Sequence, residues 1–135
     1  MALETIIAGD IEEYYDFELK GGSDKPLQLD LRKMMMQLIT DIQEDKPSGI
    51  ISGKFHNTLA HALLQIAKAA RESKQLNTVA LSGGVFCNRY LTNRVIKLLN
   101  KNSFSVLFNR DIPSNDGGIS LGQAAIAAKL TNSES

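Results

Sequence analysis

The sequence predicts an α/β fold, in which a short sheet that contains parallel strands is flanked by helices. An apolar segment at residues 77–82 has the length and composition of a buried strand, and a second one follows at 104–108. Residues 86–102, between them, have the periodicity of a helix. Strand, helix and strand in this order form a parallel pair that is joined by a right-handed crossover.

Two amphipathic helices are expected before this unit. The first follows Asp30 and the second follows Ser48, because both residues are good helix caps. Met34 to Met36 are interpreted as packing residues of the first helix. In the second and longer helix, apolar residues recur with a period near 3.6, which predicts a stripe that faces the core. The stripe consists of Ile51, Phe55, Leu59, Leu63, Ile66 and Ala70.

The remaining segments complete the expected organisation. Residues 1–12 are interpreted as a linker or helix end from a preceding lobe, and residues 13–19 alternate like a short strand. Glycines and a proline in residues 20–28 end that strand. We expect residues 116–130 to form a last helix, so that 13–130 make one lobe, and residues 131–135 to be a disordered tail.

Composition excludes several classes of protein. The 135 residues suit one small domain or part of a larger one. Lys plus Arg and Asp plus Glu number 15 each, without long runs of one sign, so no nucleic-acid or membrane partner is predicted. The single cysteine cannot form an intramolecular disulfide, and neither a secretory signal nor an apolar run of about 18 residues is present. We therefore expect a cytoplasmic location.

Two adjacent glycines follow the first parallel strand, at Gly83 and Gly84. The carboxyl end of such a strand opens onto a crevice, and glycines let a ligand approach the backbone closely. One hypothesis is that a nucleotide or phosphate lies against both glycines, with Asn88 one turn further along to bind it. The alternative is an ordinary turn in which glycine supplies a positive φ. Neither G-x-G-x-x-G nor the P-loop pattern is present.

A second glycine-rich helix start presents a carboxylate at Asp116. A carboxylate beside a nucleotide commonly binds a divalent cation, which prefers oxygen ligands. Asp is also one of the best helix caps, so a purely structural role stays open. Together, the two glycine-rich segments suggest the two walls of one crevice.

Three further residues are candidates for reactive or metal-binding groups. His56 and His61 are five positions apart, which places them about 140° apart on a helix and disfavours a shared zinc ion. We expect His61 to be at the surface or partly packed, whereas His56 and Asn57 lie beside the core stripe, near the edge of the crevice. Cys87 is interpreted as a core or lining thiol, because no base is evident for it.

Three segments occur in a characteristic order: "GKFHNTLAHAL", "VALSGGVFCNRYL" and "IPSNDGGISLGQAAIA". In this combination the chain, from about Leu3 to Leu130, resembles the carboxyl-terminal end of the HypF family, the carbamoyltransferases of [NiFe] hydrogenase maturation. The last domain of that family is similar to the TsaD and TobZ proteins. The resemblance implies one lobe of an actin-like, sugar-kinase-like ATPase fold.

The resemblance also implies an activity and partners. Carbamoyl phosphate is hydrolysed upstream, carbamate and ATP form carbamoyl-adenylate, and the carbamoyl group passes to the C-terminal cysteine of HypE. Gly83, Gly84 and Asn88 would contact the nucleotide, His56 and Asn57 would lie near the adenosine, and Asp116 would bind a divalent metal. The family commonly has glutamine at position 87, so Cys87 is a departure.

Much of the family's machinery is expected to lie outside this chain. Its paired histidine metal ligands, its zinc-binding region and its acylphosphatase domain would all precede residue 1. We therefore expect the isolated chain to be inactive and its uncovered surface to favour self-association. The alternatives are another enzyme of the same fold, either an O-carbamoyltransferase or a sugar kinase, and a stand-alone nucleotide-binding module.

Overall fold

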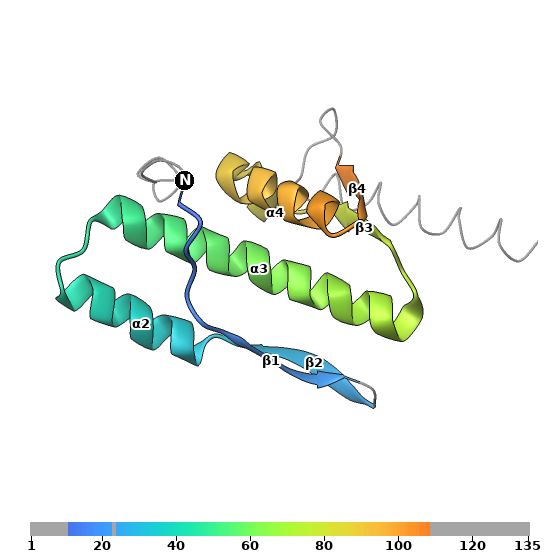
Figure 1. Cartoon of the computed structure of the whole chain (residues 1–135), viewed down its shortest axis with the longest axis horizontal. Coiled ribbons are helices and arrows are strands. Elements are labelled where there is room, and N and C mark those ends of the chain that lie inside the picture. Colours follow the sequence, from blue (N-terminus) through green and yellow to red (C-terminus); the bar gives the residue numbers. More distant parts are fainter. Residues whose placement is uncertain (1–10, 23, 109–135) are drawn as a thin grey trace, which may run out of the picture.

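The computed structural model describes residues 11–22 and 24–108, and it is a mixed α/β structure (Figure 1). Two antiparallel strands and two helices come first, and a strand, a 3₁₀ turn, a helix and a strand follow. The elements are β1 (Glu18–Gly22), β2 (Lys25–Asp30), α2 (Arg32–Gln43), α3 (Ser48–Lys74), β3 (Thr78–Leu81), η1 (Gly84–Cys87), α4 (Arg89–Lys101) and β4 (Ser105–Phe108). The predicted helix at 116–130 and both predicted chain ends, 1–10 and 131–135, lie outside the described residues.

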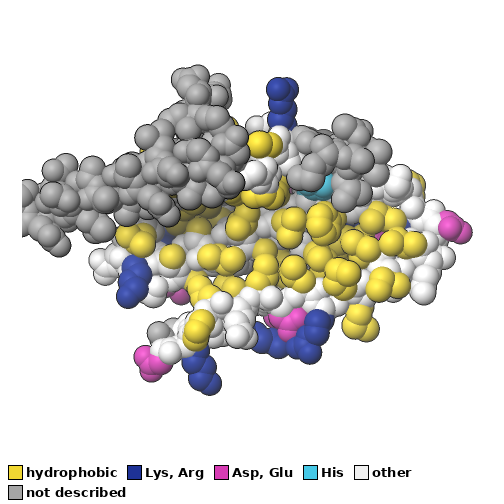
Figure 2. All heavy atoms as spheres, turned by 180° about the vertical axis from the view of Figure 1, so that it is seen from behind, with side chains coloured by type: hydrophobic (Ala, Val, Ile, Leu, Met, Phe, Trp, Pro, Cys, Tyr) yellow, Lys and Arg dark blue, Asp and Glu magenta, His cyan; other side chains and the backbone are white. Residues whose placement is uncertain are grey.

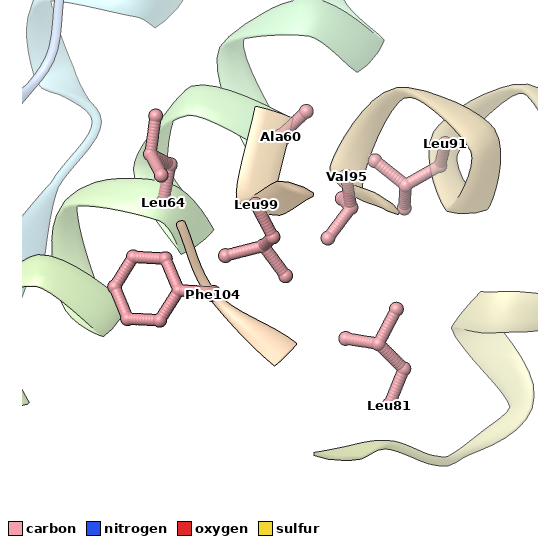
Figure 3. Packing of buried hydrophobic residues seen from close by; sticks show 7 residues of the cluster. All are labelled: Ala60, Leu64, Leu81, Leu91, Val95, Leu99 and Phe104. Carbon is pink, nitrogen blue, oxygen red and sulfur yellow. The ribbon is translucent and has the colours of Figure 1, made fainter. Parts of the chain in front are cut away.

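The predicted parallel pair is confirmed. Strand β3 pairs with β4 in parallel, with Thr78 opposite Ser105 and Leu81 opposite Phe108, and α4 forms the connection. The core lies between α3, α4 and this pair (Figure 3). Its buried members are Ala60, Leu64, Leu81, Leu91, Val95, Leu99 and Phe104. This packing fixes the end of β3, from which the glycine segment leaves.

The expected strand at 13–19 is wrong in its position. Residues 11–17 have no regular structure, and β1 begins at Glu18 and pairs with β2, a strand that the sequence did not predict. Gly21 and Gly22 lie in β1, both with positive φ, and they end it at a tight hairpin. Strand β2 is exposed over five of its six residues, so it has no alternating burial pattern to reveal it.

Both long helices are present, but neither predicted cap occupies the cap position. Leu31 precedes α2, and the Asp30 carboxylate accepts the Arg32 N–H at 3.0 Å from one residue further back. Pro47 precedes α3, so Ser48 is its first residue. Only Met34 of the three methionines is buried, whereas Met35 and Met36 are exposed, so their expected packing role is correct for Met34 alone.

The buried face of α3 differs from the predicted stripe. All six stripe residues are only half-buried, whereas the fully buried positions of this helix include polar residues. The buried residues are Gly49, Ser52, Gly53, His56, Asn57, Thr58, Ala60, Ala62 and Leu64. The difference arises because α3 packs against α2, residues 11–16 and α4 on different sides, and polar side chains of α3 form hydrogen bonds at each of these contacts.

Residues 11–16, which we call the strap, cross α3 in an extended conformation (Figure 1). Thr58 of α3 accepts the backbone N–H of Tyr15 at 2.8 Å. The hydroxyl of Tyr15, a residue 1% exposed, donates to Asp41 of α2 at 2.8 Å. Asp16 and Gln37 exchange two hydrogen bonds of 2.8 Å. The strap is thereby fixed to both long helices.

An apolar face runs along α3 on the side opposite the strap (Figure 2). Large apolar side chains of α2 are also exposed: Met35, Met36, Ile39 and Ile42. Within the described residues, no helix combines the length and hydropathy needed to cross a bilayer.

Candidate nucleotide site

The segment that leaves β3, residues 82–88, is called the glycine loop. Gly83 has φ 109° and ψ 162°, a combination that only glycine adopts readily. A Cβ atom on Gly83 would meet no heavy atom within 4 Å, so the residue faces open space. The backbone conformation therefore suffices to explain this glycine.

Gly84 needs a different explanation. Among the described glycines, positive φ occurs at Gly21, Gly22 and Gly83 but not at Gly84, which begins η1. The residue is exposed, and its conformation is open to any amino acid. Neither a positive φ nor burial of the residue accounts for glycine at this position, so the predicted contact of Gly84 with a ligand stays a prediction.

Asn88 ends the glycine loop as the N-cap of α4. Its Oδ1 accepts the N–H of Leu91 at 3.0 Å, which satisfies one of the first N–H groups of the helix. The prediction of one continuous helix from residue 86 is wrong, because η1 and this cap come first. Thr92 stabilises the junction, since its hydroxyl bonds the carbonyls of Phe86 and Asn88, both at 2.8 Å.

His56 lies directly behind the cap, and its side chain is buried rather than at the edge of a crevice. Its Nδ1 is 2.7 Å from the carbonyl of Ser52, so Nδ1 carries the proton. Nε2 then accepts the amide of Asn88 at 2.8 Å. Both ring nitrogens are engaged within the protein, which makes His56 a support for Asn88.

Asn57 is buried on the other side of the same helix turn and binds the strap. Its amide donates to the carbonyls of Ile11 at 2.6 Å and Glu13 at 2.9 Å. Its Oδ1 accepts the hydroxyl of Tyr90 at 3.0 Å. The sequence predicts that Asn57 lies near the adenosine, and in the structure its amide and carbonyl oxygen bind protein groups.

Tyr90 and Arg94 of α4 complete this cluster, and sequence reasoning missed both. Arg94, 8% exposed, donates to the Tyr90 hydroxyl at 3.1 Å, to the Ile11 carbonyl at 3.0 Å and to Glu12 at 3.0 Å. Their spacing of four places both on one helix face, but nothing in the sequence indicated that this face meets the strap.

The other predicted site residues are placed as follows. His61 is half-buried and stacks on Tyr14 with ring centroids 3.9 Å apart; burial lowers the pKa of its imidazole. Cys87 is exposed, so the core position considered for it is wrong. Asp116 lies outside the described residues. In 11–22 and 24–108, no three His, Cys, Asp or Glu side chains gather as a metal site would require.

A second polar cluster lies away from the glycine loop, beside an open groove of about 540 Å³. Buried Asp41 accepts hydrogen bonds from Tyr15 at 2.8 Å and from Lys46 and Lys54, both at 2.9 Å. Burial alone would raise the pKa of Asp41, but these three donors outweigh it and hold the pKa well below its ordinary value. Burial and the Asp41 carboxylate both raise the pKa of Tyr15.

Comparison with known proteins identifies the family of this chain. Residues 1–123 match the family described as carbamoyltransferase, Kae1-like domain, second subdomain. Carbamoyltransferase HypF of Synechocystis sp. is 36% identical over 91% of this chain and 15% of its own length, and that of Rhodobacter capsulatus is 33% identical over 95% and 16%. The chain thus spans about one sixth of these relatives.

Two solved structures are similar. Full-length HypF in its phosphate- and nucleotide-bound crystal form superposes with a TM-score of 0.83 at 41% identity, over 95% of this chain and 17% of that one. T. kodakarensis HypF superposes with a TM-score of 0.71 at 23% identity, which shows the shared fold. With a matching family model, close relatives and the same fold, the chain belongs to the HypF carbamoyltransferase family, as the second subdomain of its Kae1-like domain.

Proposed function

We propose that the chain is the C-terminal lobe of a carbamoyltransferase that forms carbamoyl-adenylate and passes the carbamoyl group to the C-terminal cysteine of a HypE-type acceptor. We assign residues 13–130 to this lobe, 1–12 to the entering linker and 131–135 to a tail. The fold is proposed to be one lobe of the actin-like, sugar-kinase-like class, in a cytoplasmic enzyme.

One observation carries the proposal most strongly. The relative solved in a phosphate- and nucleotide-bound form is 41% identical over 95% of this chain. The glycine loop supports a nucleotide site here, because Gly84 is exposed without any conformational need for glycine. Gly83 supplies the turn that brings Gly84 out of the sheet.

The proposed chemistry needs three balanced steps. Hydrolysis of carbamoyl phosphate, upstream of this lobe, yields carbamate and phosphate. A carbamate oxygen then attacks the α-phosphorus of ATP, the bond to the β-phosphate breaks, and pyrophosphate leaves. Finally the acceptor thiolate attacks the carbamoyl carbon, and AMP leaves as the thiocarbamate forms.

Within these steps the lobe binds and orients the nucleotide. Gly83 and Gly84 are proposed to contact it through their backbone. Because the side chains of His56, Asn57 and Asn88 bind protein groups, we assign them a positioning role behind the loop.

Asp116 remains the proposed ligand of a divalent metal. A carboxylate suits such a cation, whose role would be to neutralise phosphate charge. The described residues hold no cluster that could bind it alone, so the other ligands would come from elsewhere in the complete protein. Zinc is expected only in the upstream region.

The test uses the complete protein that carries this sequence, purified with its acceptor. We expect release of AMP and pyrophosphate that depends on carbamoyl phosphate, and loss of this activity in Asp116→Ala. Release of ADP instead would favour the sugar kinase, and carbamoylation of a small metabolite would favour the O-carbamoyltransferase. ATP binding without turnover would favour the stand-alone nucleotide-binding module.

A further inference from the structure

We propose that Tyr90 is a positioning residue that couples the strap to the glycine loop, so that the way the chain enters the subdomain sets the affinity of the loop for ATP. The inference rests on the proposed nucleotide site, but the coupling itself is measurable without a nucleotide.

The coupling starts at one backbone oxygen. The carbonyl of Ile11 accepts hydrogen bonds from Asn57 at 2.6 Å and Arg94 at 3.0 Å, and the Tyr90 hydroxyl lies 3.5 Å away. Tyr90 donates to Asn57 at 3.0 Å and accepts from Arg94 at 3.1 Å. Three side chains therefore surround the strap at a single point, with the hydroxyl of Tyr90 between the other two.

The same side chains lie at the end of the glycine loop. Tyr90 is the second residue of α4 and follows the cap residue Asn88 by two positions. Its ring packs edge-on against His56, with centroids 5.6 Å apart, and His56 in turn holds the Asn88 amide. Displacing Tyr90 must therefore disturb the cap, and through the cap the loop.

Adjacent residues of α3 anchor the two ends of this path. His56 binds the loop through Asn88, and Asn57 binds the strap through Ile11 and Glu13. Both are at most 3% exposed, so water does not replace these hydrogen bonds cheaply. Strap and loop thus share one rigid support, with Tyr90 bridging its two halves.

The chain offers a matched control at the other end of the strap. Tyr15 is buried, whereas Tyr90 is half-buried, and it also donates its hydroxyl to a partner on a helix, but that partner is Asp41, in the cluster away from the glycine loop. Tyr90→Phe and Tyr15→Phe each remove one hydroxyl that helps to hold the strap. Both variants keep the aromatic ring, but only the Tyr90 hydroxyl fixes a ring that packs against His56, the residue that holds the Asn88 cap.

The experiment measures hydrogen exchange and ATP kinetics of both variants in the complete protein. We expect Tyr90→Phe to speed amide exchange at residues 83–88 about tenfold without ligand, and to raise the KM for ATP about tenfold with kcat within twofold of wild type. Tyr15→Phe should leave both values unchanged. Equal effects of the two variants, or none at residues 83–88 in Tyr90→Phe, would overturn the coupling.

The two proposals can fail separately. If the wild-type protein binds no ATP but Tyr90→Phe still speeds amide exchange at residues 83–88, the coupling stands and the nucleotide site is refuted. If wild type turns over ATP but Tyr90→Phe changes neither the amide exchange at residues 83–88 nor the KM for ATP, the proposed enzyme activity stands and the coupling is refuted.

Discussion

The Asn88 amide donates to Nε2 of His56 across 2.8 Å, and this bond joins residues that are 32 positions apart. It ties the cap of α4 to the middle of α3, because His56 cannot rotate without losing the Ser52 carbonyl at its other nitrogen. Two buried polar residues thereby define where the glycine loop ends.

Replacing Asn88 by Asp should destabilise the junction between the glycine loop and α4. The carboxylate keeps the cap but has no proton for Nε2 of His56, so at pH 8 we expect a loss of about 2 kcal/mol in the free energy of unfolding. Urea unfolding of the variant and the wild type at this pH would show the loss. Asn93→Asp, at an exposed position of α4, is the control.

Alanine at Gly83 should lower stability, whereas alanine at Gly84 should weaken ATP binding. Gly83→Ala forces a side chain into a conformation open almost only to glycine, so we expect a loss of about 1–3 kcal/mol in stability. Gly84→Ala should leave the melting temperature within about 2 °C of wild type while ATP binding weakens at least tenfold. Unchanged ATP affinity in a folded Gly84→Ala protein would argue against nucleotide approach at this backbone.

Asp41→Asn should remove stability that is present only above acidic pH. The pKa of Asp41 in the folded protein lies below its unfolded value, so its stabilisation is full above the unfolded value and disappears as the pH falls through the folded one. At pH 7 we expect a loss of about 3 kcal/mol, because Lys54 is left without its buried partner. Variant and wild type should converge in urea titrations toward pH 2. Asp30→Asn, in a pair with the exposed Arg32, should cost less than about 1 kcal/mol.

Thr58→Val should loosen the strap without changing the shape of α3. It leaves the N–H of Tyr15 without its acceptor, which costs about 1–3 kcal/mol. Proteolysis should then cut the strap faster than in wild type. Thr40→Val is matched in chemistry, but its hydroxyl bonds only a carbonyl of its own helix, so it should change neither rate nor stability. Equal cleavage in Thr58→Val and wild type would speak against a strap held at this point.

Self-association of the isolated chain should depend on the large apolar side chains that α2 exposes. Met36 and Ile39 are 70% and 48% exposed on α2, and we expect lysine at both positions to shift light scattering toward the monomer. Leu107→Lys replaces a side chain that is 61% exposed on β4, and it should have little effect. A monomeric wild-type chain at high concentration would refute the expectation.

Local sequence patterns correctly predicted the elements in which the apolar residues of the pattern are also the buried ones. The pair β3 and β4 has short apolar strands that lie in the core, so composition and spacing sufficed. Strand β2 was missed because its residues are exposed and it is held by pairing with β1, which leaves no local signal. The start of β1 was misplaced for a different reason: residues 13–16 alternate like a strand, but they belong to the strap, where Tyr15 is buried through hydrogen bonds to α2 and α3.

The candidate site could be predicted only in part. Adjacent glycines marked the loop, and "FHNT" indicated His56 and Asn57, which do lie next to the loop and its neighbour Tyr90. Their burial could not be foreseen, since it depends on the strap and α4 meeting α3 from different sides. Apolar periodicity marked the half-buried face of that helix, whereas hydrogen bonds determine the buried one.

The strap has a consequence for the order in which the chain acquires its structure during synthesis. Ile11 and Arg94 are 83 positions apart, yet their hydrogen bond secures the first described residues. A ribosome that releases residues in order leaves the strap without this partner until α4 has emerged, while the hairpin and α2 can already form. The strap is thus synthesised before both long helices but is among the last of the described segments to settle, and a chaperone that binds nascent chains would meet it uncovered.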